Sequence, residues 1–250
     1  MKRFTRRAFV FFGIFFALGM ILCTAGWIMG YEPGQYLKEY RLSGIGESSG
    51  GQELEQTEFD CISSISLSAG ASVCNISAYS GDNVRVEISD STLLTCEQNG
   101  EELEISFGAG EHSIWQWMKR KSAAASEIRI YVPETLLLKR LYVEVGASDF
   151  QAEGIRCRDL EMICGAGQLS FSDEVKRNCS VECGMGAVEM LLKGMEKGFD
   201  YSLECGLGNI RIQDGPELAG AGEYTKDNRS GREMELECGL GSISVTFQAF

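Results

Sequence analysis

Four cysteines of this chain occur in one repeated setting, and thiols arranged in this way could bind a metal ion or form disulfides. Each begins a tetrapeptide Cys-Gly-x-Gly: Cys164, Cys183, Cys205 and Cys238. Apolar and polar residues alternate on both sides of every copy, which is typical of a β-strand before and after a tight turn. Each copy therefore predicts one strand-turn-strand unit, here called a rung, whose cysteine points inward.

The sequence leaves three interpretations of this cysteine column open. Buried cysteine can act as a small apolar core residue, and neighbouring rungs would bring Cα atoms within the range that a disulfide requires. A tetrahedral zinc site is the third interpretation, but rungs about 4.8 Å apart would separate the end sulfurs by about 14 Å. We expect no cofactor. The disulfide connectivity and redox state of the ten cysteines are not determined by the sequence.

A second column stands one residue before the cysteines and is expected to point outward. It consists of Glu182, Glu204 and Glu237. Carboxylates stacked at rung spacing repel one another, which raises their pKa values or recruits a cation. Two interpretations follow: a weak calcium-responsive edge, and a solvated acidic face that salt screens.

Catalytic templates are missing from the sequence. There is one histidine, no phosphate-binding loop of the Walker type and no serine nucleophile elbow. Outward carboxylates such as Glu182 and Glu204 could serve a polysaccharide hydrolase, but nothing in the sequence places them in a cleft. The formal charge of −13 also opposes binding to nucleic-acid phosphates. We expect neither an enzyme nor a nucleic-acid-binding protein.

The elements that position these columns are predicted to be stacked strands. Equivalent residues recur in register, with Cys over Cys, Glu over Glu and Gly over Gly, which favours a β-solenoid over a hairpin meander. Weaker copies at Gly70 and Gly146 extend the pattern toward the N-terminus. The predicted fold is all-β, a two-sheet β-solenoid of stacked rungs over residues 57–250, with insertions at 109–126 and 215–232.

Residues 1–30 predict a cytoplasmic basic flank and a transmembrane helix. Residues 8–30 are apolar and uncharged, and as a helix they would span roughly 34 Å. The preceding basic residues predict a single-pass, N-in/C-out topology with the solenoid outside the membrane. Residues 31–56 read as a flexible stalk rich in glycine and serine. The alternative is a cleaved signal peptide, because Cys23 and Ala25 are small enough for a cleavage site.

One aromatic and basic cluster lies in the first insertion. It consists of Trp115, Trp117, Lys119, Arg120 and Lys121. Such a cluster could contact lipid headgroups or an anionic wall polymer. Alternatively, its tryptophans could cover the core at an open end of the solenoid.

The end of the chain predicts an association edge. Apolar residues continue to the last position: Ile243, Val245, Phe247 and Phe250. A bare terminal rung would expose unpaired backbone groups, which are a template for strand addition. We therefore expect self-association or a protein partner at the C-terminal rung.

The order of these features resembles a known family. A first block of strands, the step Val132-Pro133 and a leucine-rich lead into Gly-x-Gly rungs are similar to the putative-adhesin family of bacterial β-strand-repeat proteins. That family is a domain of unknown function, often behind one membrane span, and the resemblance covers roughly Phe59–Phe250. It implies a β-solenoid in the bacterial cell envelope and no agreed activity. This chain departs from the family by placing cysteine before the turn.

These features predict a membrane-anchored extracytoplasmic interaction module that docks envelope or membrane partners in a sensor, regulatory or structural role. The alternative is an adhesin-like surface protein that binds glycans or wall polymers. The stalk favours the first, because residues 31–56 reach only about 90 Å when fully extended. The identity of the ligand or partner, the oligomeric state and cleavage of the N-terminal segment are not determined by the sequence.

Overall fold

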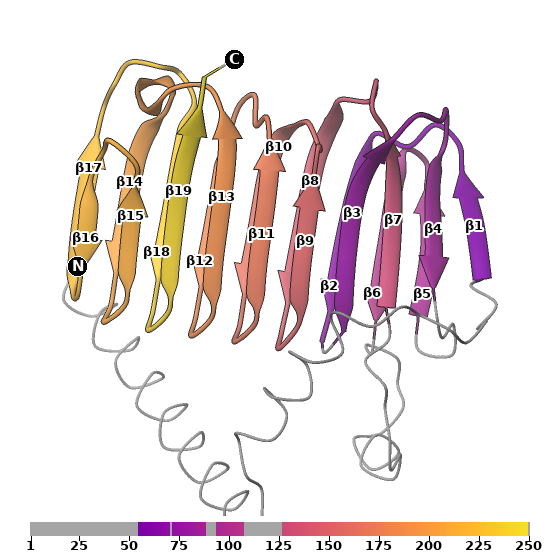
Figure 1. Cartoon of the computed structure of the whole chain (residues 1–250), viewed down its shortest axis with the longest axis horizontal. Helices are drawn as coiled ribbons and strands as arrows, with labels where there is room; N and C mark the ends of the chain where they lie inside the picture. The colour runs from indigo at the N-terminus through magenta and orange to yellow at the C-terminus, as the bar shows by residue number, and fades with distance from the viewer. Residues whose placement is uncertain (1–54, 71, 89–93, 108–126, 250) are drawn as a thin grey trace, which may run out of the picture. The chain divides into compact units, whose positions relative to one another are not determined.

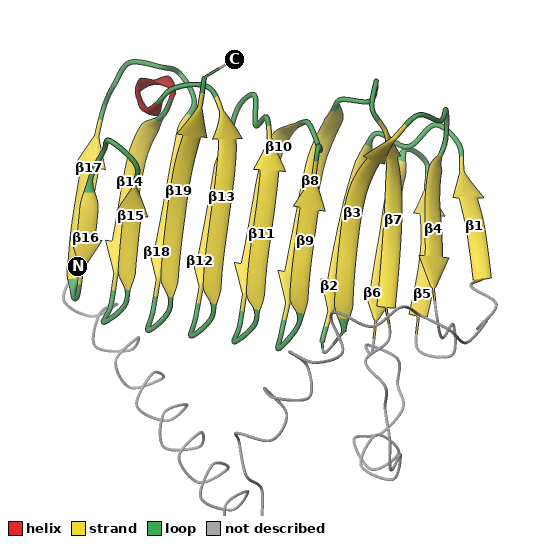
Figure 2. Cartoon of the chain, viewed as in Figure 1, coloured by secondary structure: helices red, strands yellow, loops and turns green. Residues whose placement is uncertain are grey.

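The computed structural model describes residues 55–70, 72–88, 94–107 and 127–249. The predicted transmembrane segment, nearly all of the stalk, the Trp115–Lys121 cluster and Phe250 lie outside these residues. Within the described ranges, no helix is long and apolar enough to cross a membrane. The one described helix is a short 3-10 turn, η2 (Glu196–Gly198), drawn in red in Figure 2.

The described chain forms two sheets, which confirms the all-β, two-sheet prediction (Figure 1). The ten-stranded sheet, called sheet A, contains in spatial order β1 (Glu55–Phe59), β4 (Val84–Ile88), β7 (Glu127–Pro133), β3 (Val73–Tyr79), β9 (Asp149–Glu153), β11 (Gln168–Asp173), β13 (Ala187–Lys193), β19 (Ser242–Gln248), β15 (Asn209–Ile212) and β16 (Glu217–Ala219). The nine-stranded sheet, called sheet B, contains β5 (Leu94–Asn99), β6 (Glu102–Phe107), β2 (Ser64–Ala69), β8 (Leu138–Val145), β10 (Cys157–Cys164), β12 (Cys179–Cys183), β18 (Glu233–Cys238), β14 (Asp200–Cys205) and β17 (Gly222–Lys226).

Each rung consists of a sheet B strand, a tight turn and a sheet A strand. Neighbouring rungs are parallel and in register, so that Cys164 pairs with Cys183 in sheet B and Leu169 pairs with Val188 in sheet A. Figure 2 shows the tight turns along one edge of the solenoid, here called the turn edge. Five of these turns are residues 146–148, 165–167, 184–186, 206–208 and 239–241. The connections from one rung to the next lie along the opposite edge.

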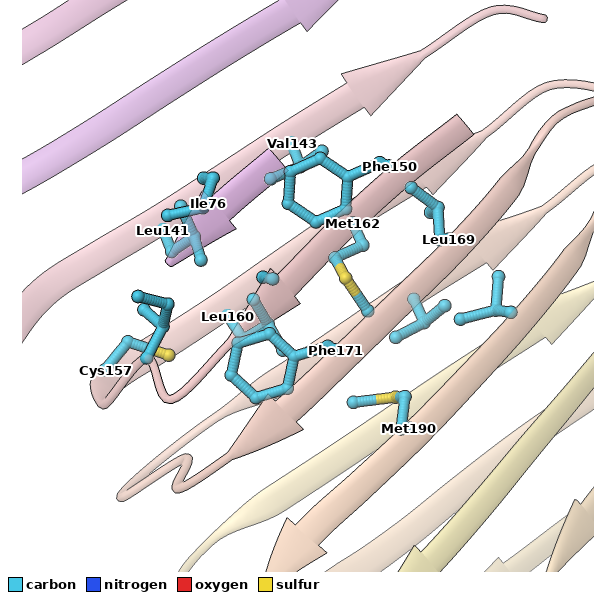
Figure 3. Packing of buried hydrophobic residues seen from close by; sticks show 14 of the residues in the cluster. Ile76, Leu141, Val143, Phe150, Cys157, Leu160, Met162, Leu169, Phe171 and Met190 are labelled. Atoms are coloured by element: carbon cyan, nitrogen blue, oxygen red, sulfur yellow. The ribbon is translucent and has the colours of Figure 1, made fainter. Parts of the chain in front are cut away.

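The core lies between the two sheets and follows the predicted alternation. Phe150 and Phe171 of sheet A and Met162 of sheet B are at most 2% exposed. Figure 3 shows these side chains in one packed layer with Met190. Burying a side chain of this size stabilises the fold by about 1.5–3 kcal/mol, and the same inward positions repeat in every rung. Alternation at period two is therefore sufficient to build one continuous core.

Stacking of the turns explains their glycines. The Gly165 N–H donates to the Val145 carbonyl at 2.8 Å, and the Gly184 N–H donates to the Cys164 carbonyl at 2.8 Å, so the ladder continues through the turn. A Cβ on Gly165 would lie 2.7 Å from the Gly146 carbonyl oxygen. Glycine is needed here because the backbones of successive turns are in close contact.

The last rung lies inside the stack, so the prediction that it forms a free end is wrong. Strand β18 pairs with both β12 and β14, and β19 pairs with both β13 and β15. Ile243 and Val245 are each 1% exposed, and the ring of Phe247 lies 6.2 Å from that of Phe199. The physical reason is the long segment after β15, which lets the chain return and insert its last rung between two earlier ones. The first rung, β2 and β3, is likewise enclosed, by β6 and β7 on one side and β8 and β9 on the other.

Antiparallel strands form both ends of the stack. The predicted insertion at 215–232 contains β16, which pairs with β15, and β17, which pairs with β14. At the other end, β1 pairs antiparallel with β4, and β5 with β6. The Asp200 carboxylate accepts backbone N–H bonds from Ser230, Asn228 and Gly231, and these bonds hold its pKa below the usual range. The insertion is thus an ordered cap.

Candidate functional site

The structure brings the three predicted glutamates together and adds a fourth. The strand order β12-β18-β14-β17 places Glu182 beside Glu237, Glu237 beside Glu204 and Glu204 beside Glu223. We call these four residues the acidic strip. Sequence order had put Glu237 at one end of the column, whereas insertion of β18 places it in the middle. Glu223 was missed because it stands in the cap, outside the Cys-Gly-x-Gly repeats.

The acidic strip carries negative charge that no ion pair among the described residues neutralises. Partial burial, followed by repulsion from Glu182, Glu204 and Glu235, raises the pKa of Glu237. Among the described ion pairs, none includes a member of the strip. The described residues also contain no group of three or more Cys, His, Asp or Glu arranged to hold a metal ion. The calcium interpretation therefore gains no support from the geometry, and the strip is a charged surface.

Replacing Glu237 with glutamine is expected to raise the melting temperature at pH 7. Because the folded-state pKa of Glu237 is above the usual 4.5, the folded chain binds this proton more tightly than the unfolded chain does. The free energy of unfolding then falls as pH rises through and above 4.5. The advantage of Glu237→Gln should disappear below that pH, as thermal melts at several pH values would show.

Glu189 provides the matched control, since it is an outward glutamate on sheet A, away from the strip. We expect Glu189→Gln to leave the melting temperature nearly unchanged at every pH. A Glu237→Gln variant that melts below the native chain at pH 7 would contradict the repulsion argument.

The four predicted cysteines do form one buried column, in the spatial order Cys164, Cys183, Cys238, Cys205. Each is at most 4% exposed, and every described cysteine is a free thiol. The Cys164 thiol donates to the Gly167 carbonyl at 3.3 Å, and its interaction with the Cys183 thiol lowers the pKa of Cys164 and raises that of Cys183. Burial, with a smaller contribution from the neighbouring Cys205 thiol, raises the pKa of Cys238. The thiols therefore meet in two pairs.

Close packing explains why cysteine accompanies these glycines. A Cβ on Gly186 would lie 2.5 Å from the Cys164 sulfur, and one on Gly241 would lie 2.7 Å from the Cys183 sulfur. Each of these two thiols fills space that the second glycine of the neighbouring turn leaves open. The geometry supports the core-packing interpretation, in which cysteine is a small apolar residue.

Mild oxidation is expected to link Cys164 to Cys183 and Cys205 to Cys238. In each case two thiols and one oxidised glutathione would give one protein disulfide and two reduced glutathiones. Registered neighbours across one strand spacing meet the Cα separation of a disulfide. The thiol contacts within each pair favour these links over one between Cys183 and Cys238, which are also registered, and Cys183 and Cys205 are separated by β18. Peptide mapping by mass spectrometry would identify the links.

A Cys238→Ser variant should keep the Cys164–Cys183 link and lose the link to Cys205. Recovery of a Cys183–Cys205 disulfide from the folded native chain would contradict the observed rung order.

The variable residue of the Cys-Gly-x-Gly turns was not singled out from the sequence, yet it forms an exposed apolar row. Met185, Leu207 and Leu240 are 66%, 73% and 40% exposed on the turn edge. The available signal was the residue type at this one position, which is Ala, Met, Leu and Leu in the four copies.

The outward face of sheet A contains a shallow groove across β9, β11, β13 and β19. Its outward lining is mostly polar: Gln151, Glu153, Ser170, Ser172, Glu189, Leu191, Ser244 and Thr246. Leu191 is the exposed apolar member. No repeat signal marked this groove, because its two registered rows of outward residues differ in residue type from one rung to the next.

A solved structure shares this fold, whereas no curated protein matches the sequence. A putative cell adhesion protein from Clostridium sporogenes is 20% identical, with 78% of this chain and 99% of that chain aligned, at a TM-score of 0.58. A putative adhesin from Bacteroides fragilis is 11% identical over 78% of this chain and 98% of that chain, at a TM-score of 0.36.

A family model matches the sequence of this chain, and the match agrees with the observed architecture. The model, described as Toastrack DUF4097, matches residues 62–216. The match includes all of the enclosed first rung and the Cys164, Cys183 and Cys205 turns. With stacked parallel rungs in two sheets and glycine turns along one edge, the chain belongs to the Toastrack DUF4097 family of β-domains of unknown function.

Proposed function

We propose that this chain is a membrane-anchored, extracytoplasmic interaction module that docks envelope or membrane proteins through the acidic strip. The observation that carries the proposal is the row of four registered glutamates without a described cationic partner. A basic partner surface would replace carboxylate repulsion with attraction, which increases both association rate and specificity. The role of such a module would be sensory, regulatory or structural.

The antiparallel strands at the ends of the solenoid favour docking through a face. Strands β16 and β17 run antiparallel to their neighbours at one end, and β1 and β5 do so at the other. A further parallel rung is therefore not the expected mode of association. The apolar sequence at 8–30 and the short stalk would keep the acidic strip near other membrane proteins.

The test is photo-crosslinking of the full-length chain in cells. A photoreactive amino acid would replace Glu182 or Ser180 on sheet B and, as the control, Glu189 on sheet A. We expect specific envelope or membrane proteins at the sheet B positions. Capture by the photoreactive residue at position 180 should be lost when all four strip residues are changed to glutamine. It should be retained when only Glu189 is changed to glutamine. Equal capture from both sheets, or capture unaffected by the fourfold change, would contradict docking through the strip.

A second candidate function is adhesion, with a surface glycan or wall polymer bound in the groove of sheet A. Hydroxyl and amide side chains such as Ser170, Ser172 and Gln151 can hydrogen-bond to sugar hydroxyls, and Leu191 offers an apolar contact. The Clostridium sporogenes structure, which shares the fold, is described as a putative cell adhesion protein.

Binding to purified wall polymers and glycan arrays would separate the two functions. The adhesin function predicts binding that Leu191→Glu abolishes and the fourfold glutamine variant leaves intact. Docking through the acidic strip predicts that neither the native chain nor these variants bind glycans.

A further inference from the structure

Three exposed apolar side chains form a continuous row along the turn edge. The Leu240 N–H donates to the Gly184 carbonyl at 2.7 Å, and the Leu207 N–H donates to the Gly239 carbonyl at 2.7 Å. These bonds stack Leu240 on the Met185 turn and Leu207 on the Leu240 turn. We call Met185, Leu240 and Leu207 the apolar ridge.

The apolar ridge has no charged residue within its turns. Each member stands between two glycines, so that bare backbone and apolar side chains make up the surface from one turn to the next. Met185 is 66% exposed, Leu240 is 40% exposed and Leu207 is 73% exposed. Scattered exposed apolar residues need no explanation, whereas contiguous ones mark contact surfaces. The row extends over about 10 Å, two strand spacings.

The described chain begins at this same edge. Strand pairing aligns Glu55 with Ile88, Ile88 with Ile128, Ile128 with Cys74 and Cys74 with Phe150. Phe150 is the second residue after a tight turn, so the backbone of residue 55 also lies at the turn edge. The apolar sequence at 8–30 is therefore joined to the solenoid at this edge, through 24 residues.

The first insertion is joined to the turn edge as well. Phe107 pairs with Ala69, which pairs with Val145, the residue just before a turn. Glu127 pairs with Val73 just after one. The insertion between Phe107 and Glu127 contains two tryptophans and three consecutive basic residues, a composition suited to lipid headgroups. Two segments with membrane-type sequences thus meet the solenoid along one edge.

We propose that the turn edge faces the lipid bilayer and that the apolar ridge inserts into the bilayer interface. This rests on the membrane anchoring in the proposed function. Leucine and methionine side chains gain by leaving water for the interface. The anchor makes this contact intramolecular, so a ridge too small to bind vesicles alone still orients the tethered domain. The partner is the lipid surface itself.

Met195 offers a matched control on the opposite edge. It lies in the connection between β13 and β14 and is 74% exposed, against 73% for Leu207. The full-length chain would be reconstituted into phosphatidylcholine vesicles with a photoreactive amino acid in place of Leu207, Leu240, Met185 or Met195. All four side chains are exposed, so these substitutions should preserve the fold.

After flotation and irradiation, we expect severalfold more lipid adduct at each ridge position than at Met195. Equal adduct yields at Leu207 and Met195 in floated vesicles would overturn the ridge proposal while leaving anchoring intact. Crosslinks from the ridge to a second copy of the chain, without lipid adduct, would also overturn it. A chain that fails to float with the vesicles would overturn the anchoring itself, and the ridge proposal with it.

Discussion

Replacing Gly167 with alanine is expected to lower the free energy of unfolding by about 3 kcal/mol, the upper end of typical overpacking costs. A Cβ at this position would lie 1.9 Å from the Ser148 carbonyl oxygen and 2.9 Å from its carbonyl carbon. The obstacle is backbone, which cannot rotate away as a side chain can. For a domain of this size the melting temperature should fall by about 6–12 °C, which thermal and urea unfolding would measure.

Gly198→Ala is the control for this prediction. A Cβ at Gly198 would meet only an Arg232 guanidinium nitrogen, at 3.4 Å, so alanine should leave stability unchanged or raise it slightly. If Gly167→Ala melts at the same temperature as Gly198→Ala, close stacking of the turns is not what requires glycine.

Truncation before Glu233, which removes β18 and β19, is expected to unfold the chain from β14 to β17. Five buried side chains would be lost: Met234, Leu236, Cys238, Ile243 and Val245. At about 2 kcal/mol each, their summed contribution of about 10 kcal/mol is comparable to the whole stability of a domain. In addition, β14 and β15 would lose their pairing to the rest of the solenoid.

Amide hydrogen exchange would measure this outcome strand by strand. Protection should be lost in β14 and β15 and retained in β10 and β11. Removing only Ala249 and Phe250 is the control, and it should leave protection unchanged because Ala249 is exposed. Persisting protection in β14 and β15 would show that they can pair directly with β12 and β13, and that the inserted rung is dispensable.

The enclosed last rung also changes where binding is to be sought. An open C-terminal rung would have favoured growth by addition of parallel rungs, but both ends of the solenoid are formed by antiparallel strands instead. The exposed features are instead a charged face on sheet B, a polar groove on sheet A and an apolar turn edge. The acidic strip adjoins the turn edge, since Glu182, Glu237 and Glu204 each stand three residues before a residue of the apolar ridge, whereas the groove lies on the other sheet.

Local features of the sequence were sufficient to predict the strands and the turns. Alternation around Cys164, for example, predicted both β10 and β11, because period-two burial is a property of each strand by itself. Glycine at positions 165 and 167 marked a turn without room for side chains. The inward cysteines and outward glutamates followed from the same alternation.

Only the tertiary structure decided which rung lies beside which. The Cys-Gly-x-Gly rungs present nearly the same backbone and side chains, so the Cys183 rung can accept either the Cys205 rung or the Cys238 rung with similar local pairing. The choice depends on the connection from Ile212 to Glu233, which is long enough to return over the stack, and on the cap formed by β16 and β17. These are long-range terms, and they alone place Glu237 at the centre of the acidic strip and bury the last rung.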